Sequence, residues 1–195
     1  MHPGDFTPVC TTELGKAALM EGEFAKRNTK LCGFSCNDQQ SHKDWIMDIK
    51  AVTGGDVTFP LFCDPDREVA AALNILDESN KDLKSGLPLT VRSVFFLKPG
   101  TKDIALMMTY PASTGRNFDE ILRVLDSLQL TATKSVATPV DWKKGEDVIV
   151  NFPLTNADAD AKFGKGGYKI VDVPSEAGKK DLVKNYLRYV SGKDV

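Results

Sequence analysis

The sequence predicts a layered α/β fold, with helices packed on the faces of a β-sheet. Segments with helical spacing of apolar residues alternate with short apolar runs over residues 11–128. Of the 195 residues, 42% are hydrophobic and 27% are charged, as in an average globular protein. This composition disfavours global disorder and a coiled coil.

The first part of the chain predicts a helix, a strand and a second helix. Apolar side chains recur at spacings near 3.6 over residues 11–27, which is typical of a helix. A short apolar run at 30–35 predicts a buried strand. Ser41 is the expected N-cap of the second helix because Asp44 follows three residues later, and Gly54-Gly55 ends that helix.

The next part predicts a strand, a helix, a β-hairpin and a long amphipathic helix. In chain order these are residues 58–63, 69–76, the pair 90–97 and 104–110, and 118–128. The hairpin is expected because its two apolar runs flank a Pro99-Gly100 turn. The last helix carries the clearest apolar stripe in the chain.

The pattern breaks down after residue 131, where the sequence becomes charged and is interrupted by glycine and proline. We therefore expect a main domain over residues 1–131 and a small C-terminal domain or arm over residues 132–195, without a second independent core. Basic residues in this part are interrupted by acidic ones, so they predict a solvated face. They are Lys179, Lys180, Lys184 and Arg188.

The chain opens almost directly on its first helix, whereas a strand normally precedes such a helix in an α/β layer. Either the sheet is built without that strand, or the sequence is a shortened form of a longer protein. We expect the second, because losing a central strand removes buried apolar area and exposes strand edges.

Charge and hydropathy argue against several function classes. The net charge of −2 and the isoelectric point near 5.7 disfavour a nucleic-acid partner. No apolar run approaches the ~18 residues of a membrane span, so we expect no stable membrane insertion. Residues 1–7 lack the basic and apolar regions of a secretory signal, which favours a cytoplasmic location.

The sequence has four cysteines: Cys10, Cys32, Cys36 and Cys63. Without a secretory signal, free thiols in a reducing compartment are expected rather than a disulfide scaffold. The last three lie in or after apolar strands, where free cysteine packs as a small hydrophobe. The histidines, His2 and His42, add no matching ligand pair, so no metal site is predicted. His42, in the first turn of a helix, is expected to be solvated.

Cys10 lies at the start of the first predicted helix, a position that affects the ionisation of its thiol. Pro8 suits the first helical turn because it has no N–H to leave unpaired, and Thr7 is a natural N-cap. Unpaired N–H groups and the helix dipole favour an anion at this end of a helix. We therefore expect Cys10 to be partly thiolate, the reactive form. A buried structural cysteine remains the alternative.

Four stretches of the sequence are similar to peroxiredoxins, which are thiol peroxidases with a thioredoxin-like fold. They are His2 to Glu13 (HPGDFTPVCTTE), Leu87 to Phe95, Tyr110 to Leu122 and Ala137 to Lys143. The last three resemble the 1-Cys, peroxiredoxin-6-like subfamily. The resemblance implies a thioredoxin-like fold, with a central mixed sheet and flanking helices, and a C-terminal dimerisation arm in a homodimer. Trp142 and Phe152 are the expected anchors of that arm.

The resemblance also implies an active site. Cys10 would be the peroxidatic cysteine, which attacks a hydroperoxide and becomes sulfenic acid. Thr7 would hydrogen-bond the thiolate and the peroxide, and Pro8 would shield the site from bulk water. Arg92 would stabilise the thiolate and the charge that develops on the oxygens.

Three further residues match positions near the family's site, and each has an alternative interpretation. Glu13 would orient Arg92, or would only compensate the helix dipole. Arg116 would lie beside the site, or would form a surface ion pair. His2 would lie close to the cysteine, or would belong to a disordered terminus.

The sequence implies a reductant from outside the chain, because no cysteine follows Cys63 that could act as a C-terminal resolving cysteine. Glutathione and a thioredoxin-like protein both fit as the external thiol, and no bound cofactor is expected. Some family members also hydrolyse phospholipids, but the position of their aspartate is Gly100 here, so we predict no such activity. The alternative function is a redox-sensing or holdase-type binding protein with weak peroxidase activity.

Overall fold

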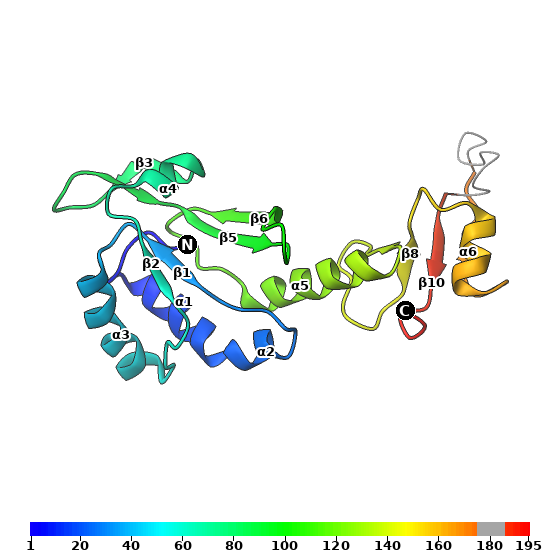
Figure 1. Ribbon diagram of the computed structural model, residues 1–195, viewed down its shortest axis with the longest axis horizontal. Helices are drawn as coiled ribbons and strands as arrows, with labels where there is room; N and C mark the ends of the chain where they lie inside the picture. Colours follow the sequence, from blue (N-terminus) through cyan, green and yellow to red (C-terminus); the bar gives the residue numbers. More distant parts are fainter. Residues whose placement is uncertain (175–185) are drawn as a thin grey trace. The chain divides into compact units, whose positions relative to one another are not determined.

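The computed structural model describes residues 1–174 and 186–195, which form two compact units, Met1–Phe118 and Asp119–Val195. The long helix α5 (Phe118–Thr133) thus falls almost wholly in the second unit, whereas the sequence suggested a boundary at residue 131. Helices and strands alternate through the first part of the first unit (Figure 1), as the α/β prediction requires, and its last four strands follow one another without a helix between them.

The first predicted helix is two helices, α1 (Pro8–Leu19) and α2 (Glu21–Ala25), which meet at Met20. The Met20 backbone, with φ −100° and ψ 4°, lies outside the α-helical region and separates them. Helix α1 begins at Pro8, earlier than residue 11, because Thr7 is extended and Pro8 has the preset φ of a first helical residue.

Helix α3 (Gln39–Thr53) also begins earlier than predicted, because its N-cap is Asp38 rather than Ser41. The Asp38 carboxylate accepts a hydrogen bond from the Ser41 amide at 2.8 Å, which satisfies one of the free donors of the first turn. The helix ends at Gly54, whose φ of 74° suits a residue without a side chain.

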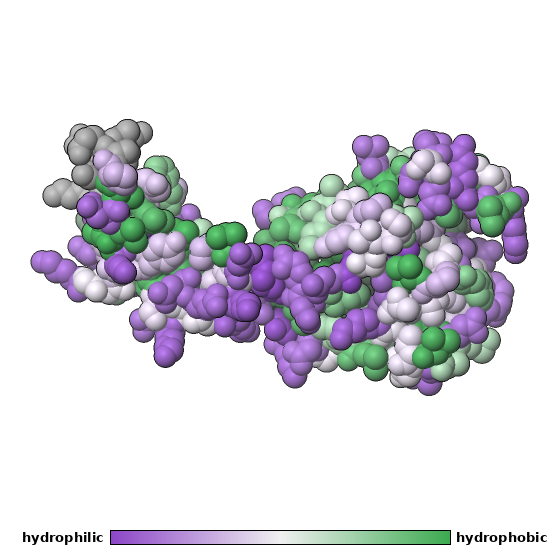
Figure 2. Space-filling view, turned by 180° about the vertical axis from the view of Figure 1, so that it is seen from behind, coloured by the Kyte–Doolittle hydropathy of each residue, from purple (hydrophilic) through white to green (hydrophobic). Residues whose placement is uncertain are grey.

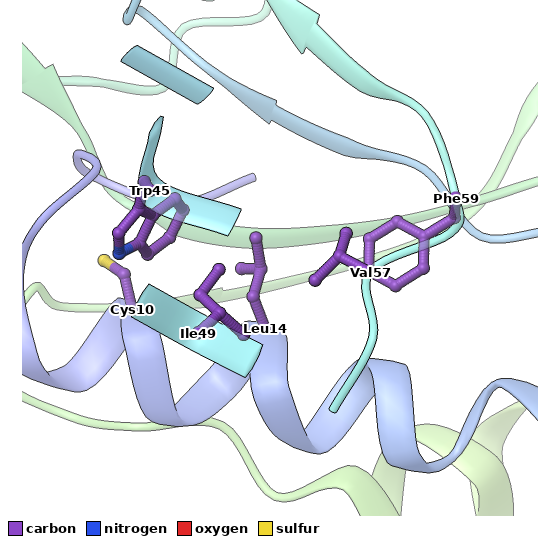
Figure 3. Packing of buried hydrophobic residues seen from close by; sticks show 6 residues of the cluster. All are labelled: Cys10, Leu14, Trp45, Ile49, Val57 and Phe59. Atoms are coloured by element: carbon purple, nitrogen blue, oxygen red, sulfur yellow. The ribbon is translucent and has the colours of Figure 1, made fainter. Parts of the chain in front are cut away.

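Helices α1 and α3 pack side by side on one face of β1 and β2 (Figure 1) and enclose a hydrophobic core. Its buried members, shown in Figure 3, are Cys10, Leu14, Trp45, Ile49, Val57 and Phe59. Farther along α1 than Cys10, the main chain at Gly15 closely approaches the main chain at Gly55, two residues after the end of α3. A Cβ at residue 55 would lie 2.6 Å from the Gly15 carbonyl oxygen. Glycine is therefore required by the packing of the helix pair.

The strands of the first unit form three two-stranded pieces. They are parallel β1 (Gly33–Ser35) and β2 (Leu61–Cys63), antiparallel β3 (Leu76–Lys81) and β4 (Pro88–Thr90), and antiparallel β5 (Arg92–Leu97) and β6 (Ile104–Tyr110). The β5–β6 hairpin confirms the Pro-Gly turn prediction, and helix α4 (Glu68–Ala72) is shorter than predicted. The sequence missed β3, whose residues are mostly polar.

The expected central mixed sheet is thus divided into separate pieces, and Met1 and His2 lie between the pieces that contain β1 and β5. The His2 amide donates to the Phe34 carbonyl of β1 at 3.0 Å, and the Met1 amine donates to the Ser93 carbonyl of β5 at 2.7 Å. These two residues connect β1 with β5 and deliver the chain directly to the cysteine-bearing turn.

The second unit has a core of its own, contrary to the expectation of an arm without one. Its antiparallel sheet has the order β7-β8-β10-β9, formed by β7 (Val136–Ala137), β8 (Val148–Val150), β9 (Lys169–Ile170) and β10 (Arg188–Val190), with α6 (Asn156–Phe163) beside it. The buried cluster consists of Val136, Trp142, Val148, Val150, Ala159 and Val190. Short strands can build this core because three antiparallel pairings share one sheet.

Two expectations for the second unit were wrong. Trp142 is buried in that unit's own core, where its indole N–H donates to the Glu146 carbonyl at 3.0 Å, so it is no free anchor; Phe152 is exposed. Arg188 is fully buried rather than solvated, and it donates to the Leu154 carbonyl at 2.7 Å. Lys179, Lys180 and Lys184 lie outside the described residues.

Within residues 1–174 and 186–195, none of the helices combines the length and the apolar character that crossing a bilayer requires. In the space-filling view, hydrophilic and hydrophobic residues are interspersed over the visible face (Figure 2).

Candidate active site

The first turn of α1 presents Cys10 at the end of a short loop from His2. The first helical hydrogen bond runs from the Thr11 amide to the Thr7 carbonyl at 3.0 Å, so the amides of Val9 and Cys10 precede it and point out of the helix end. The Thr7 hydroxyl donates to the Gly4 carbonyl at 2.9 Å rather than capping the helix. Its oxygen therefore keeps accepting capacity.

Arg92, from the first residue of β5, brings a positive charge to the sulfur. Its Nη1 atom lies 3.2 Å from Cys10 Sγ. The guanidinium is held from its other side by the Ala112 carbonyl, to which Nε donates at 2.8 Å and Nη2 at 2.5 Å. Cys10 has no exposed surface and Arg92 is 3% exposed, so this contact is shielded from water.

Glu13 holds Arg92 and Arg116 together. One carboxylate oxygen accepts from Arg92 Nη1 at 2.8 Å and from Arg116 Nη2 at 2.7 Å, and the other accepts from the Arg116 amide and Nε. Burial alone would raise the pKa of Glu13, but the hydrogen bonds and charge of Arg116, with the charge of Arg92, hold it below its usual value. Glu13 therefore orients the guanidinium groups and does not merely compensate the helix dipole. Arg116 is buried and forms no surface ion pair.

The sulfur, one guanidinium and the free amides of a helix end thus converge in the interior of the first unit. Such an arrangement stabilises a thiolate and any negative charge that develops on atoms bound beside it. The structure brings together four predicted residues, namely Cys10, Arg92, Glu13 and Arg116. Pro8 is exposed at the first helical position, and the hydroxyl of Thr7 faces Gly4.

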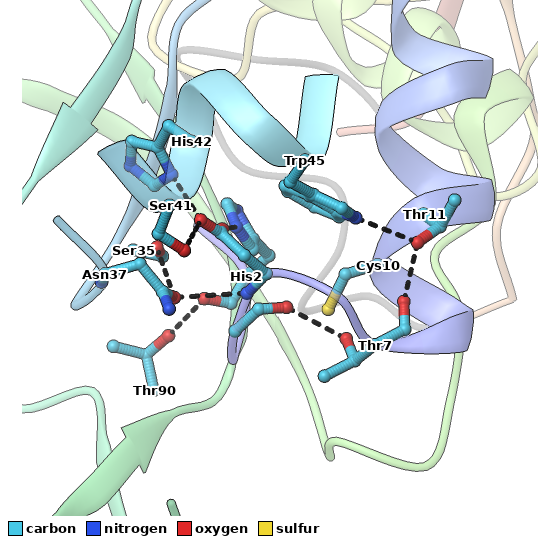
Figure 4. Close-up of polar contacts among 12 residues, drawn as sticks. His2, Thr7, Cys10, Thr11, Ser35, Asn37, Ser41, His42, Trp45 and Thr90 are labelled. Carbon is cyan, nitrogen blue, oxygen red and sulfur yellow. Dashed lines mark hydrogen bonds and ion pairs between the residues drawn. The ribbon is translucent and has the colours of Figure 1, made fainter. Parts of the chain in front are cut away.

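His2 belongs to a second network, centred on the buried carboxylate of Asp5. Its members His2, Ser41 and His42 are labelled in Figure 4. His2 Nε2 lies 3.0 Å from one Asp5 oxygen, and His42 Nδ1 lies 2.7 Å from the other. The Ser41 hydroxyl donates to that second oxygen at 2.7 Å. His2 is thus an ordered, buried residue. His42 is buried as well, so the expectation that it is solvated was wrong.

The pKa values of the two histidines that contact Asp5 are shifted in opposite directions. Burial lowers the pKa of His2 to about 4, despite its hydrogen bond to Asp5. Burial also opposes a charge on His42, but the hydrogen bond and charge of Asp5 outweigh it and raise the pKa of His42. Burial of Asp5 is likewise outweighed by hydrogen bonds from His2, His42 and Ser41, which lower the pKa of Asp5 to about 2. Of the two histidines, His42 is therefore the one whose protonated form Asp5 favours.

We expect His2 to make the protein lose stability as the pH falls. The native state keeps His2 neutral down to about pH 4, whereas the unfolded state protonates it from the ordinary pKa of 6.5. Between these pH values the unfolded state binds more protons than the native state. The free energy of unfolding therefore decreases by about 3 kcal/mol in all as the pH is lowered from 6.5 to 4. The His2→Gln variant should show a correspondingly weaker dependence between pH 6.5 and 4, measured by urea unfolding.

His42 supplies the contrasting control. Its raised pKa stabilises the protein below the ordinary value of 6.5, and that contribution is lost as the pH rises through the raised pKa. The His42→Gln variant should therefore change how the free energy of unfolding depends on pH above 6.5, and not between pH 6.5 and 4. Equal acid dependence in the parent and His2→Gln proteins would contradict the assignment of the neutral state to His2.

The other cysteines divide into one buried and two exposed residues. Cys36 is buried, and burial raises the pKa of its thiol. Cys32 and Cys63 are exposed, so the expectation that they pack as small hydrophobes was wrong for both. Each lies at an end of a short strand, where neighbouring elements cover it incompletely. The described residues contain no group of three or more His, Cys, Asp or Glu side chains suited to a metal ion.

Comparisons with known proteins agree with this geometry. Residues 1–102 match the model of the AhpC/TSA family, and residues 127–166 match the C-terminal domain of 1-Cys peroxiredoxin. The chain belongs to this family, as a 1-Cys peroxiredoxin. Its relatives identify it as a thiol-dependent peroxidase with a single peroxidatic cysteine.

Two relatives and two solved structures illustrate the match. The peroxiredoxin is 52% identical to Peroxiredoxin-6 of Rattus norvegicus and 47% identical to 1-Cys peroxiredoxin of Medicago truncatula; the alignments cover 96% and 97% of this chain, and 81% and 83% of those relatives. A cysteine-to-serine mutant of Peroxiredoxin 6 of Arenicola marina is 44% identical, with a TM-score of 0.88 over 98% of this chain and 83% of that one. Yeast mitochondrial 1-Cys peroxiredoxin is 41% identical, with a TM-score of 0.82 over 97% of this chain and 83% of that one.

Sequence reasoning on this peroxiredoxin missed the contacts of four residues: Asp5 with His42, and Thr11 with Trp45. A signal was present for two of them. His42, Trp45 and Ile49 recur at spacings of three and four residues, which places them on one face of α3. A histidine on the buried face of a helix needs a polar partner, and Asp5 is that partner.

Proposed function

We propose that Cys10 is the peroxidatic cysteine of this peroxidase and that Arg92 stabilises both its thiolate and the breaking O–O bond. The observation that supports this most strongly is the 3.2 Å separation between Arg92 Nη1 and Cys10 Sγ, both of which are buried. A fixed guanidinium at this distance favours the anionic sulfur and is already in place for charge on an adjacent oxygen.

In the proposed reaction the Cys10 thiolate attacks the nearer oxygen of a hydroperoxide. The S–O bond forms as the O–O bond breaks, and the leaving oxygen takes a proton to depart as water or an alcohol. Cys10 is oxidised to sulfenic acid while the peroxide is reduced. The Cys10 amide, ahead of the first helical hydrogen bond, is available to hydrogen-bond the peroxide.

The remaining site residues have supporting roles in this proposal. Thr7, whose hydroxyl proton is directed to Gly4, offers its oxygen to accept a hydrogen bond from the peroxide. Pro8 covers the site at its solvent side. Glu13 and Arg116 orient Arg92 through the shared carboxylate. His2, which is bound to Asp5, positions the loop that leads into the first turn.

Rapid loss of one thiol tests the proposal. One equivalent of hydrogen peroxide at neutral pH should oxidise one cysteine per chain within seconds, and peptide mass spectrometry should locate the sulfenic acid at Cys10. The double variant Cys32→Ser, Cys63→Ser removes the two exposed thiols and should react at the parent rate. Oxidation of the exposed cysteines first, with Cys10 intact, would instead favour a redox-sensing or holdase-type protein.

The reductant that we propose is an external thiol, either glutathione or a thioredoxin-like protein. The solved yeast mitochondrial relative concerns resolution of the thiol through glutathione and thioredoxin systems. In the present chain, the exposed thiols Cys32 and Cys63 lie at the ends of β1 and β2 and not on the cysteine-bearing turn. Comparing turnover with glutathione and with thioredoxin plus its reductase distinguishes the two sources.

We also propose a homodimer and a cytoplasmic location. The exposed apolar side chains of the second unit, among them Val140 and Phe152, support an interface there. Sedimentation velocity over a range of concentrations measures the dimer directly. The four free cysteines are compatible with a reducing compartment, which cell fractionation can test.

A further inference from the structure

The loop that leads into the cysteine-bearing turn contains a strained residue. Phe6 has a φ of 54°, in the left-handed region that residues with a side chain rarely adopt. Its ring is 55% exposed, so packing of the ring does not hold this backbone in place. Such a conformation persists only where neighbouring contacts fix it. The residue before it, Asp5, is buried and makes contacts of this kind.

Asp5 connects the loop to the start of α3 and to the end of β1. One carboxylate oxygen lies 2.7 Å from both the Ser41 hydroxyl and His42 Nδ1, and the Asp5 amide donates to Asn37 Oδ1 at 3.1 Å. These three partners are labelled in Figure 4. Because Cys10 follows five residues after Asp5, the position of Asp5 affects where the sulfur lies.

The contacts of His42 require a protonated ring. Nδ1 faces the Asp5 carboxylate at 2.7 Å, and Nε2 faces the Phe62 carbonyl of β2 at 3.3 Å. Both partners can only accept a hydrogen bond, whereas a neutral imidazole carries a single N–H. Only the imidazolium therefore satisfies both. His2 differs, because Nε2 alone contacts Asp5 and its buried Nδ1 has no hydrogen-bond partner among residues 1–174 and 186–195, as a neutral ring allows.

The charged and titratable groups around His42 favour the same state. Burial opposes a charge on His42, but the hydrogen bond and charge of Asp5 and the charge of Asp38, the N-cap of α3, raise its pKa above 6.5. The ring of His2, 6.2 Å away between centroids, stays neutral down to about pH 4 because burial lowers its pKa. On β2, burial and the charges of Asp5 and Asp38 raise the pKa of the Cys63 thiol above 9.0. His42 is thus the group of this cluster that titrates first as the pH rises above 6.5.

We propose that Asp5 and the His42 imidazolium are a positioning pair that holds the loop, and with it the Cys10 sulfur, in place beside Arg92, and that the pair weakens when His42 loses its proton. A neutral ring keeps only one of its two contacts, and a bond to Asp5 then loses its charge assistance. The sulfur and the guanidinium, 3.2 Å apart, have to stay aligned with the peroxide, so a small displacement slows the reaction. The inference rests on the proposed role of Cys10.

The His42→Gln variant tests the pair, because glutamine keeps an N–H donor and does not titrate. At pH 6.5 the parent should react with hydrogen peroxide about ten times faster than the variant, the effect of a small misplacement of a reacting group. As the pH rises through the pKa of His42, the ratio of the two rates should fall towards one, because the parent then carries a neutral ring as well. The ratio removes the ionisation of Cys10 itself, which occurs in both proteins. Stopped-flow measurements between about pH 6 and 9 give the rates.

Asp44 offers a matched control on the same helix. Its carboxylate is exposed and accepts from Gln40 Nε2 at 2.8 Å, on the solvent side of α3. The Asp44→Asn variant removes a negative charge close to His42 in the sequence and should keep the parent rate at each pH.

Nitrogen-15 NMR of the parent tests the proton positions without a variant, because the chain contains only two histidines. At pH 6.5 the His42 ring should carry two N–H groups and the His2 ring one, at Nε2. The pKa measured for His42 should coincide with the pH at which the rate ratio falls. If His42→Gln does not fold, the rate of the parent, divided by its thiolate fraction from ultraviolet absorbance, should fall through that same pKa.

Two neutral rings at pH 6.5, or a rate ratio that does not change with pH, would overturn the proposal. An equal loss of rate in Asp44→Asn would do so as well. Failure of the proposed function looks different, since Cys10 would then not be oxidised by peroxide at any pH, while the two ring states seen by NMR would remain.

Discussion

The Arg92→Met variant should react with hydrogen peroxide about 10²- to 10³-fold more slowly than the parent, the usual effect of removing one fixed donor from a developing charge. Methionine fills a similar volume but brings no positive charge to the sulfur 3.2 Å away. The loss combines a smaller thiolate fraction with weaker stabilisation of the breaking O–O bond. Stopped-flow measurement of Cys10 oxidation gives the rate, and Cys10→Ser gives the zero baseline.

Two further variants show whether the position of the charge matters. Arg27→Met removes a guanidinium that pairs with Glu23 on α2, and it should leave the rate unchanged. Arg92→Lys keeps a charge but loses the planar fork that contacts both Cys10 and Ala112, so it should recover only part of the rate. A parent-like rate in Arg92→Met would exclude the role proposed for this residue.

The Glu13→Gln variant should lose about 3–5 kcal/mol of unfolding free energy, because two buried guanidinium groups are left without their shared counter-charge. Glu13, Arg92 and Arg116 all have side chains at most 7% exposed. The lowered pKa of Glu13 adds a pH dependence: its contribution is present above the ordinary value of 4.5 and is lost as the pH falls through the lower native value. Urea unfolding at neutral pH measures the loss.

Glu23→Gln is the matched control for this prediction. Glu23 also contacts two cations, Lys26 and Arg27, but on the surface of α2. Exposed ion pairs contribute about 0–1 kcal/mol, so this variant should unfold close to the parent midpoint. If Glu13→Gln were as stable as Glu23→Gln, the carboxylate would not be the structural centre of the site.

The local part of the active site could be predicted from the sequence. Proline at the first helical position and threonine before it determine where α1 begins, and this places Cys10 in the first turn. The amphipathic stripe of α5 and the Pro-Gly turn of the β5–β6 hairpin are local signals as well. Each depends on neighbouring residues in the chain, so periodicity and turn chemistry suffice to find it.

The long-range part could not be derived in this way. Arg92 is 82 positions from Cys10, and Arg116 is 103 from Glu13, so only the resemblance to a family suggested that they meet. The burial of His42 was missed because its partner, Asp5, lies in a loop with no periodicity. The polar strand β3 escaped prediction because its pairing with β4, rather than its own residues, makes it a strand.

The main chain of α1 meets the segment that follows α3 at Gly15 and Gly55, little more than one turn beyond Cys10. A side chain at residue 55 would force the two main chains apart, because its Cβ would lie 2.6 Å from the Gly15 carbonyl oxygen. The position of the helix that carries the reactive sulfur thus depends on a main-chain contact that includes no reacting atom.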